Sequence, residues 1–408
     1  MLFDYYQKGC GCRSRRIKSK SFVSLCKTAC RRAGVAVQKQ LDIEFDSRLW
    51  YRIDWLNVVL VFLLACIGLG AIFSATYHVE APLSPLFKKQ FFGVLGGFFF
   101  YGLFFFLNRR ALVWWGSLLY LITIALLLFT LVRGSVGMGA QRWINIGLFK
   151  FQPSELAKLF FPAIFTRLLG LEVNPRLRLR RLVLLLFFLA CSVILILKQP
   201  DLGTALIILF SGIVLLWIAG LGRTFFIIGL CTALLGAPLA WRMLKPYQKQ
   251  RVVVFLGGGS KQKERYQVEQ SRIAVGSGGV LGKGYLQGTQ SRLSFLPENH
   301  TDFIFAVICE EWGFMGAFTV VFLFFLLFAS ALNRIGTLGS VSYQLLAVGL
   351  ILPTFFSAFI NMAMVLGVLP IVGIPLPFIT YGLTHLLIDF ASMGWYNNII
   401  SRGPWKTL

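Results

Sequence analysis

The chain has 408 residues, of which 57% are hydrophobic and only 14% are charged, and its mean hydropathy is +0.74. Soluble globular proteins are usually about 45–50% apolar and about 25% charged. The composition therefore excludes a disordered chain, a collagen and an ordinary cytosolic enzyme, and it indicates a polytopic helical membrane protein.

The formal net charge is +24, from 40 Lys and Arg against 16 Asp and Glu. In a soluble protein this excess would suggest a nucleic-acid partner. In a membrane protein, basic residues collect in cytoplasmic loops, so we interpret the charge as topology and expect no nucleic acid. Residues 1–52 hold twelve Lys and Arg against four acids and are predicted to form a basic cytoplasmic tail.

The eight cysteines do not form a disulfide framework. Cys10, Cys12, Cys26 and Cys30 lie in the basic tail, and their spacing, without a nearby histidine, matches the usual zinc-ligand patterns poorly. We therefore expect reduced thiols and no metal site.

Ten apolar runs follow the tail, most of them near the length of about 20 residues that a spanning helix needs. They cover residues 55–75, 90–107, 111–132, 155–170, 182–197, 203–221, 224–241, 312–332, 343–366 and 379–399. If the N-terminus is cytoplasmic, every inside loop carries a basic residue, and the dense cluster at 176–181 falls inside. The prediction is an all-α polytopic protein with about ten transmembrane helices, one membrane domain over 53–408, and both termini in the cytoplasm.

The connection at 242–311 differs from the others because it is long, Gly-rich and mixed in charge. Long connections between packed helices are usually functional or disordered. Its apolar stretches and glycines favour an ordered extracytoplasmic loop with short helices, between the seventh and eighth spanning segments.

The first polar cluster runs from Gln141 to Lys158. Pro153 is placed like a first-turn proline, so a helix should begin there. Arg142 and Lys150 near a helix N-terminus would bind an anion such as phosphate. Glu155 and Lys158 are i,i+3 neighbours. The structural alternative is an interfacial Trp/Arg anchor with a local ion pair.

Three further segments carry weaker signals. Asp201 most simply caps the sixth helix. The amides and cations of 246–251, Gln248 among them, suit sugar hydroxyls, phosphates or lipid headgroups equally well. The run at 276–284 resembles a phosphate loop, but Ser277 and Gly284 break the required pattern, so nucleotide binding is not expected.

The segment Leu296–Phe305 places ionisable side chains just before an apolar run. Such groups near a membrane are costly, and they indicate a functional site. Asp302 could act as a general base, with Glu298 and His300 beside it. The alternative is that Thr301 or Asp302 caps a helix.

The Pro- and Gly-rich stretch at 367–382 suggests a broken segment, which a membrane protein tolerates only where it is buried in protein or lines a cavity. Downstream, His385 and Asp389 are spaced i,i+4 and could pair on one helix face. Their role stays open.

Together, the stretches 141–158, 199–205, 246–251, 270–316 and 361–382 resemble the SEDS family of bacterial cell-wall proteins, in family order. The segments at 199–205 and 246–248 look more like the elongation branch of that family than the division branch. Leu383, Thr384, His385 and Asp389 depart from the family pattern.

The resemblance implies an inverting peptidoglycan glycosyltransferase of the inner membrane. It would polymerise lipid II into β-1,4-linked glycan strands, with undecaprenyl diphosphate as leaving group. Its expected partners are lipid II, the nascent glycan strand, a class B penicillin-binding protein (the transpeptidase) and other membrane proteins of the elongation complex. No cofactor is certain; a divalent cation, Mg²⁺ or Mn²⁺, could sit between a carboxylate and the diphosphate, although no ligand cluster specifies one.

Carried over residue by residue, Asp302 matches the family's essential loop aspartate, Arg142 the basic residue of the R-W motif, and Gln248 the glutamine after P-Y. Lys150, Glu155 and Lys158 match further polar positions of the same cavity.

Two other functions remain open at this point. A lipid II flippase would also need a polar cavity with cations, but no base at its outer face. A non-catalytic scaffold for the transpeptidase would tolerate conservative changes at Arg142 and Asp302.

Overall fold

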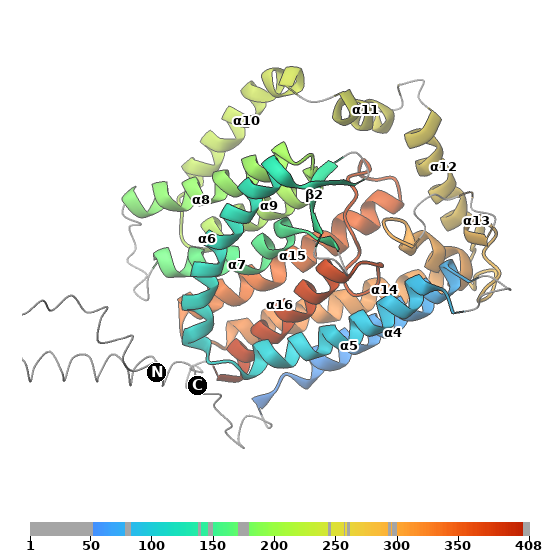
Figure 1. Ribbon diagram of the computed structural model, residues 1–408, viewed down its shortest axis with the longest axis horizontal. Coiled ribbons are helices and arrows are strands. Elements are labelled where there is room, and N and C mark those ends of the chain that lie inside the picture. Colours follow the sequence, from blue (N-terminus) through green and yellow to red (C-terminus); the bar gives the residue numbers. More distant parts are fainter. Residues whose placement is uncertain are drawn as a thin grey trace, which may run out of the picture. The chain divides into compact units, whose positions relative to one another are not determined.

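The computed structural model describes residues 52–77, 83–137, 140–145, 150–169, 179–243, 246–256, 258, 262–292, 295 and 300–402 (Figure 1). The predicted tail, apart from its last residue, lies outside these ranges, and so does Glu298.

A helix occupies each of the ten predicted apolar runs. They are α4 (Trp55–Ala75), α5 (Pro85–Phe106), α6 (Arg109–Arg133), α7 (Pro153–Leu169), α8 (Leu179–Lys198), α9 (Leu202–Ile218), α10 (Arg223–Met243), α14 (Ile304–Gly336), α15 (Val341–Val365) and α16 (Leu383–Arg402). Within the described ranges, six of them, α4, α5, α6, α8, α14 and α15, are long and apolar enough to cross a membrane. A helical multi-pass membrane fold is confirmed, whereas the count of ten spanning helices stays a prediction.

The described part of the connection between α10 and α14 contains three short helices, as the sequence predicted: α11 (Pro246–Phe255), α12 (Gln262–Ser277) and α13 (Thr289–Arg292). The last residues of the predicted loop, 304–311, already belong to α14, which begins at Ile304, and the outer boundary of the membrane segment stays a prediction. The buried apolar residues 304–309 extend the helix toward the N-terminus, and its backbone then breaks at Gly313, where φ is 64°.

The Gly-rich run at 276–284 is a turn that packs on this break. The backbone N–H of Lys283 donates to the carbonyl of Glu310 at 3.0 Å, and that of Phe314 donates to the carbonyl of Gly279 at 2.8 Å. A Cβ on Gly282 would lie 2.1 Å from the carbonyl oxygen of Glu311, so only glycine fits there. The glycines therefore serve close backbone contact.

A buried carboxylate anchors the same turn. Glu310 has no exposed surface and accepts hydrogen bonds from the Nζ of Lys283 at 2.6 Å and from the backbone N–H of Thr289 at 2.8 Å. Charge-assisted bonds of this kind are about twice as strong as neutral ones. They hold the segment that leads to residues 300–302.

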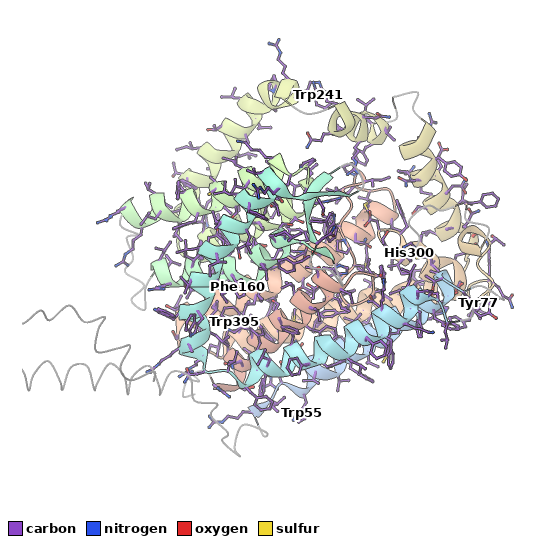
Figure 2. The ribbon with its side chains drawn as sticks, viewed as in Figure 1. Trp55, Tyr77, Phe160, Trp241, His300 and Trp395 are labelled. Atoms are coloured by element: carbon purple, nitrogen blue, oxygen red, sulfur yellow. The ribbon has the colours of Figure 1, made fainter. Side chains whose placement is uncertain are left out.

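Helices from distant parts of the chain lie side by side. Figure 1 shows α16 running along α5, and α14 along α4. The rings of Phe160 and Trp395 lie 6.4 Å apart in the core between α7 and α16, as Figure 2 shows. In the same view, His300 and Tyr77 lie toward the opposite side. The segment around His300, which contains the predicted base Asp302, is therefore well separated from Phe160 and Trp395.

The Pro- and Gly-rich stretch is non-helical and largely buried, as expected. Leu376, Phe378 and Ile379 are fully buried. Backbone groups in such a place need partners inside the protein. The side chain of Gln90, itself fully buried, donates to the carbonyl of Thr380 at 3.2 Å and accepts from the N–H of Gly382 at 3.2 Å.

Gly68 in α4 makes room for this stretch, because a Cβ on it would lie 2.6 Å from the Cα of Ile379. We expect Gly68→Ala to lower the free energy of unfolding by about 1–3 kcal/mol, since neither backbone can move easily. The matched control is Gly70→Ala, where the nearest atom would be 4.0 Å away. Thermal unfolding in detergent measures both, and equal midpoints for the two variants would contradict the prediction.

The structure adds one feature that the sequence analysis did not predict, a three-stranded antiparallel sheet in the described residues between α6 and α7. Its strands are β1 (Ser135–Gly137), β2 (Ala140–Asn145) and β3 (Lys150–Phe151), in the order β1-β2-β3. Trp143 on β2 pairs with Ser135 on β1, and the hydroxyl of Ser135 also donates to the backbone carbonyl of Trp143 at 2.9 Å. Strand β2 of this sheet carries Arg142.

Candidate active site

Asp201, at the start of α9, contacts Arg142 on β2 and the residues at the start of α7. As predicted, it is the N-cap of α9, and it accepts a hydrogen bond from the N–H of Thr204 at 3.2 Å. It is only 3% exposed, and it lies 3.6 Å from the guanidinium of Arg142 on β2. Gln152 donates to it at 2.8 Å and Ser154 at 3.3 Å. The cap is therefore also the anchor for Arg142.

Hydrogen bonds from Gln152 and Ser154 hold Asp201 at the start of α7, and its ion pair with Arg142 places the guanidinium there too. That helix begins at Pro153, as the first-turn proline predicted. The strands fix the backbone of Arg142, and the carboxylate fixes its guanidinium, so a cation is held between two helix N-termini. Such a place suits an anion, because unpaired N–H groups and the helix dipole both favour negative charge.

The predicted pair of Glu155 and Lys158 is present one turn further into α7. Their charged atoms are 2.6 Å apart, and both side chains are buried, 4% and 6% exposed. Lys158 also interacts electrostatically with Asp389 of α16, which is hydrogen-bonded to Thr354 of α15. Buried charges persist where they are paired, so this cluster ties three helices together.

Asp302 lies in the turn immediately before α14 and is half-buried. Its Oδ2 would lie 3.4 Å from a Cβ on Gly373, whose φ of +76° and missing side chain leave room for the carboxylate. Asn361, fully buried in α15, donates from one amide group to the carbonyl of Asp302 at 2.9 Å and to that of Ile374 at 2.7 Å. These bonds fix the backbone on both sides of the carboxylate.

The N-cap residue of α14 is Phe303, whose side chain makes no capping hydrogen bond, so neither Thr301 nor Asp302 occupies the N-cap position itself. His300 lies beside Asp302 in the chain; its carbonyl accepts from the N–H of Tyr381 at 3.1 Å, and the two rings are 5.9 Å apart. The Asp302 turn is thus attached to the non-helical stretch at two points.

Residues 372–374 join the two parts of the site. A Cβ on Gly203, in the first turn of α9, would lie 2.6 Å from Ile374 and 3.5 Å from the carbonyl oxygen of Val372. The helix capped by Asp201 therefore packs against the same short segment that Asp302 contacts through Gly373. Tertiary packing thus links the start of α9, where Asp201 contacts Arg142, to the Asp302 turn through residues 372–374.

The other predicted residues have different outcomes. Gln248 is 8% exposed in α11, a helix that packs against α12. The backbone of Lys150 forms β3, but its side chain lies outside the described part of the structure, as does all of Glu298. Among the described residues, no group of three or more His, Cys, Asp or Glu side chains could hold a metal ion.

Sequence reasoning did not assign Asp201, Gln152 or Asn361 to this site. Asp201 carried a capping signal only, and its contact with Arg142 spans about 60 residues of chain, which no local pattern reveals. Asn361 lies in an apolar run, where an amide side chain among mostly apolar residues was the available signal.

Comparison with known proteins identifies the family of the chain. The FtsW, RodA and SpoVE family, described as cell cycle proteins, matches residues 54–402. Peptidoglycan glycosyltransferase MrdB of Escherichia coli (strain K12) is 40% identical over 285 residues, which cover 69% of this chain and 76% of that protein.

Two solved structures share the fold along most of their length. A chain of a peptidoglycan synthase complex matches with a TM-score of 0.72 and 30% identity, over 85% of this chain and 97% of that one. Rod shape determining protein RodA of Thermus thermophilus matches with a TM-score of 0.65 and 27% identity, over 86% of this chain and 97% of that one. The chain therefore belongs to the FtsW, RodA and SpoVE family of cell cycle proteins, the SEDS family that its motifs indicated.

Proposed function

We propose that this protein is a peptidoglycan glycosyltransferase that polymerises lipid II into β-1,4-linked glycan strands for cell elongation. Its family, and a relative named for the same activity, support the reaction class. The observation that carries the proposal is that residues 372–374 lie against both Asp302 and Gly203, which follows the Arg142-bound Asp201 by two residues. A sugar transfer with an anionic leaving group needs a base and a cation at one place.

The reaction inverts the configuration at C1, the anomeric carbon of the donor sugar. The 4-hydroxyl of the acceptor sugar attacks C1 of the donor, the bond from C1 to the diphosphate oxygen breaks, and the polyprenyl diphosphate leaves with the bonding electrons. Asp302 takes the hydroxyl proton as the new bond forms. The diphosphate leaves as an anion, so it needs positive charge rather than a proton, and Arg142 and Lys150 supply that charge.

The remaining candidates are proposed to bind the substrates. Glu155 and Lys158 are proposed to support the site from α7, where they form a buried pair with charged atoms 2.6 Å apart. Gln248, Glu298 and His300 are proposed to contact sugar or diphosphate groups. The described residues offer no protein cage for Mg²⁺ or Mn²⁺, and no step above depends on a metal.

The proposed partner is a class B penicillin-binding protein, with other membrane proteins of the elongation complex. One structural neighbour belongs to a peptidoglycan synthase complex, which supports a partner of this kind. The proposed location is the bacterial inner membrane with both termini in the cytoplasm, because the basic residues then fall in the inside loops.

The test is a polymerisation assay on the full chain purified with its transpeptidase. Labelled lipid II is supplied, and glycan strands are resolved on a gel. We expect strands from the wild type. Failure to form strands in a folded complex, together with movement of lipid II across vesicles that contain the protein, would replace the proposal by a flippase.

Asp201→Asn separates the two roles of the anchor. Asparagine is also a good N-cap, so α9 should keep its start, whereas Arg142 loses its charged partner. We expect strand formation to fall about tenfold, the loss that corresponds to roughly 1.4 kcal/mol. Asp201→Ala should in addition lose about 1 kcal/mol of stability, because it removes the cap. Wild-type activity in Asp201→Asn would show that the Arg142 contact is structural only.

A further inference from the structure

A second basic place lies outside the site described above. A cavity of about 160 Å³ is enclosed by α11, α12 and residues 367–371. Its lining includes Arg251, Arg265 and Arg272 against one acid, Glu269, which pairs with Arg265 at 2.8 Å, so the lining keeps a formal excess of two positive charges. The cavity is comparable in size to an engineered cavity of roughly 150 Å³ that binds benzene, which is enough for a phosphate group.

The wall with Arg272 is fixed in place. Its guanidinium donates to the carbonyl of Gly367 at 2.9 Å. A Cβ on Gly367, whose φ is +73°, would lie 2.3 Å from the Nε of Arg272, so the guanidinium lies directly on a glycine. Arginine presents five N–H donors in a rigid fork that matches phosphate oxygens. Although Arg272 is exposed, its hydrogen bond to Gly367 restrains the guanidinium and lowers the cost of ordering it around an anion.

The rest of the lining is apolar. Val254, Val268 and residues 369–371 contribute hydrocarbon surface beside the arginines. Large apolar side chains next to the cavity are also exposed, including Leu256 at 75% and Ile273 at 48%. Basic residues beside exposed apolar side chains are the pattern of helices that lie in a membrane interface. A free anion in water would not need this hydrocarbon surface.

We propose that this cavity binds the phosphate of a membrane lipid, with the phosphate against the arginines and the chain along the apolar side chains. The lipid phosphate can come from a bulk phospholipid headgroup or from a polyprenyl diphosphate. The proposal rests on the proposed function only for the second source. Residues 369–371 line the cavity and lead directly into residues 372–374, the segment that Asp302 contacts. A lipid bound in the cavity would therefore stabilise that segment.

The test measures lipid binding to the full chain by native mass spectrometry from detergent. The probes are phosphatidylglycerol, undecaprenyl diphosphate and, as the lipid without phosphate, diacylglycerol. The variant is Arg251→Gln/Arg265→Gln. The matched control is Arg242→Gln/Lys249→Gln, which removes the same charge from α10 and α11 outside the cavity lining.

We expect the cavity variant to bind at least about tenfold more weakly to one or both phosphate lipids, because each lost contact is a hydrogen bond between charged groups. The control should bind like the wild type. Weakening for undecaprenyl diphosphate alone identifies the substrate lipid, and weakening for both lipids identifies a general headgroup site. Two results would overturn the proposal. One is equal binding of the phosphate lipids by the cavity variant and the control variant, and the other is binding of diacylglycerol as tight as that of the phosphate lipids.

Two further variants complete the test. One tests the size of the cavity without changing its charge, and the other tests whether lipid binding depends on catalysis. Val268→Phe narrows the cavity and keeps all three arginines, so it should weaken the same lipids, and unchanged binding would overturn the proposal. Asp302→Asn should bind like the wild type, because the measurement needs no catalysis. Lipid binding can thus fail or succeed independently of strand formation.

Discussion

Replacing Asp302 by asparagine is expected to reduce glycan-strand formation by roughly 10²–10⁴-fold, the usual contribution of a general base. The amide has the shape of the carboxylate but cannot take the proton of the attacking hydroxyl. Asn361 bonds the backbone carbonyl of Asp302, so the turn should keep its structure. Strand formation from labelled lipid II, with the transpeptidase present, measures the effect.

Two comparisons make this result decisive. The thermal unfolding midpoint and the binding of the transpeptidase should match the wild type, which shows that only the chemistry has changed. Asp302→Glu should be intermediate, because it keeps a base but moves the carboxylate by one methylene from its place beside Gly373. Strand formation within about threefold of the wild type in Asp302→Asn would contradict the assignment of the base; the 10²-fold lower bound lies well outside that range.

Breaking the buried pair of Glu155 and Lys158 is expected to have the largest effect on stability. Removing one partner of a buried ion pair leaves an uncompensated charge and costs about 3–5 kcal/mol. Lys158→Met should be worse than Glu155→Gln, because Lys158 also faces Asp389, so its loss leaves two carboxylates without a cation. Thermal unfolding in detergent measures the order.

The exposed pair of Arg265 and Glu269 provides the control. Its atoms are 2.8 Å apart, close to the distance in the buried pair, but both side chains are more than half exposed. Surface pairs contribute about 0–1 kcal/mol, so Glu269→Gln should hardly move the unfolding midpoint. The double variant Glu155→Gln/Lys158→Met should recover part of the loss relative to Lys158→Met, because only Asp389, and no longer Glu155, is then left without its cation. Equal stability of all these variants would show that burial does not strengthen the pair.

Much of the fold followed from the sequence, because a membrane imposes a simple pattern. Each apolar run became a helix, since a backbone in hydrocarbon must satisfy its own hydrogen bonds. Pro153 and Asp201 marked helix starts correctly, because both signals act within one turn. The break at Gly313 was missed, because it depends on a turn from another part of the chain that packs on it.

The site was predicted as separate pieces. The motifs indicated Arg142 and Asp302, which are 160 residues apart in the chain, and local chemistry suggested their roles. Nothing local indicated that Asp201 would hold Arg142, that Asn361 would hold Asp302, or that Gly203 and Gly373 would bring these parts against one short segment.

By itself the sequence determined a helical membrane protein, the positions of its helices, the polar residues that a cell-wall polymerase would need, and the family. These properties depend on hydropathy and on short motifs, which are written along the chain. Only the tertiary structure decided which polar residues meet, that the Gly-rich turn supports a broken helix, and that a basic cavity lies beside residues 367–371. Those properties depend on contacts between distant residues, and contacts of this kind are fixed by packing.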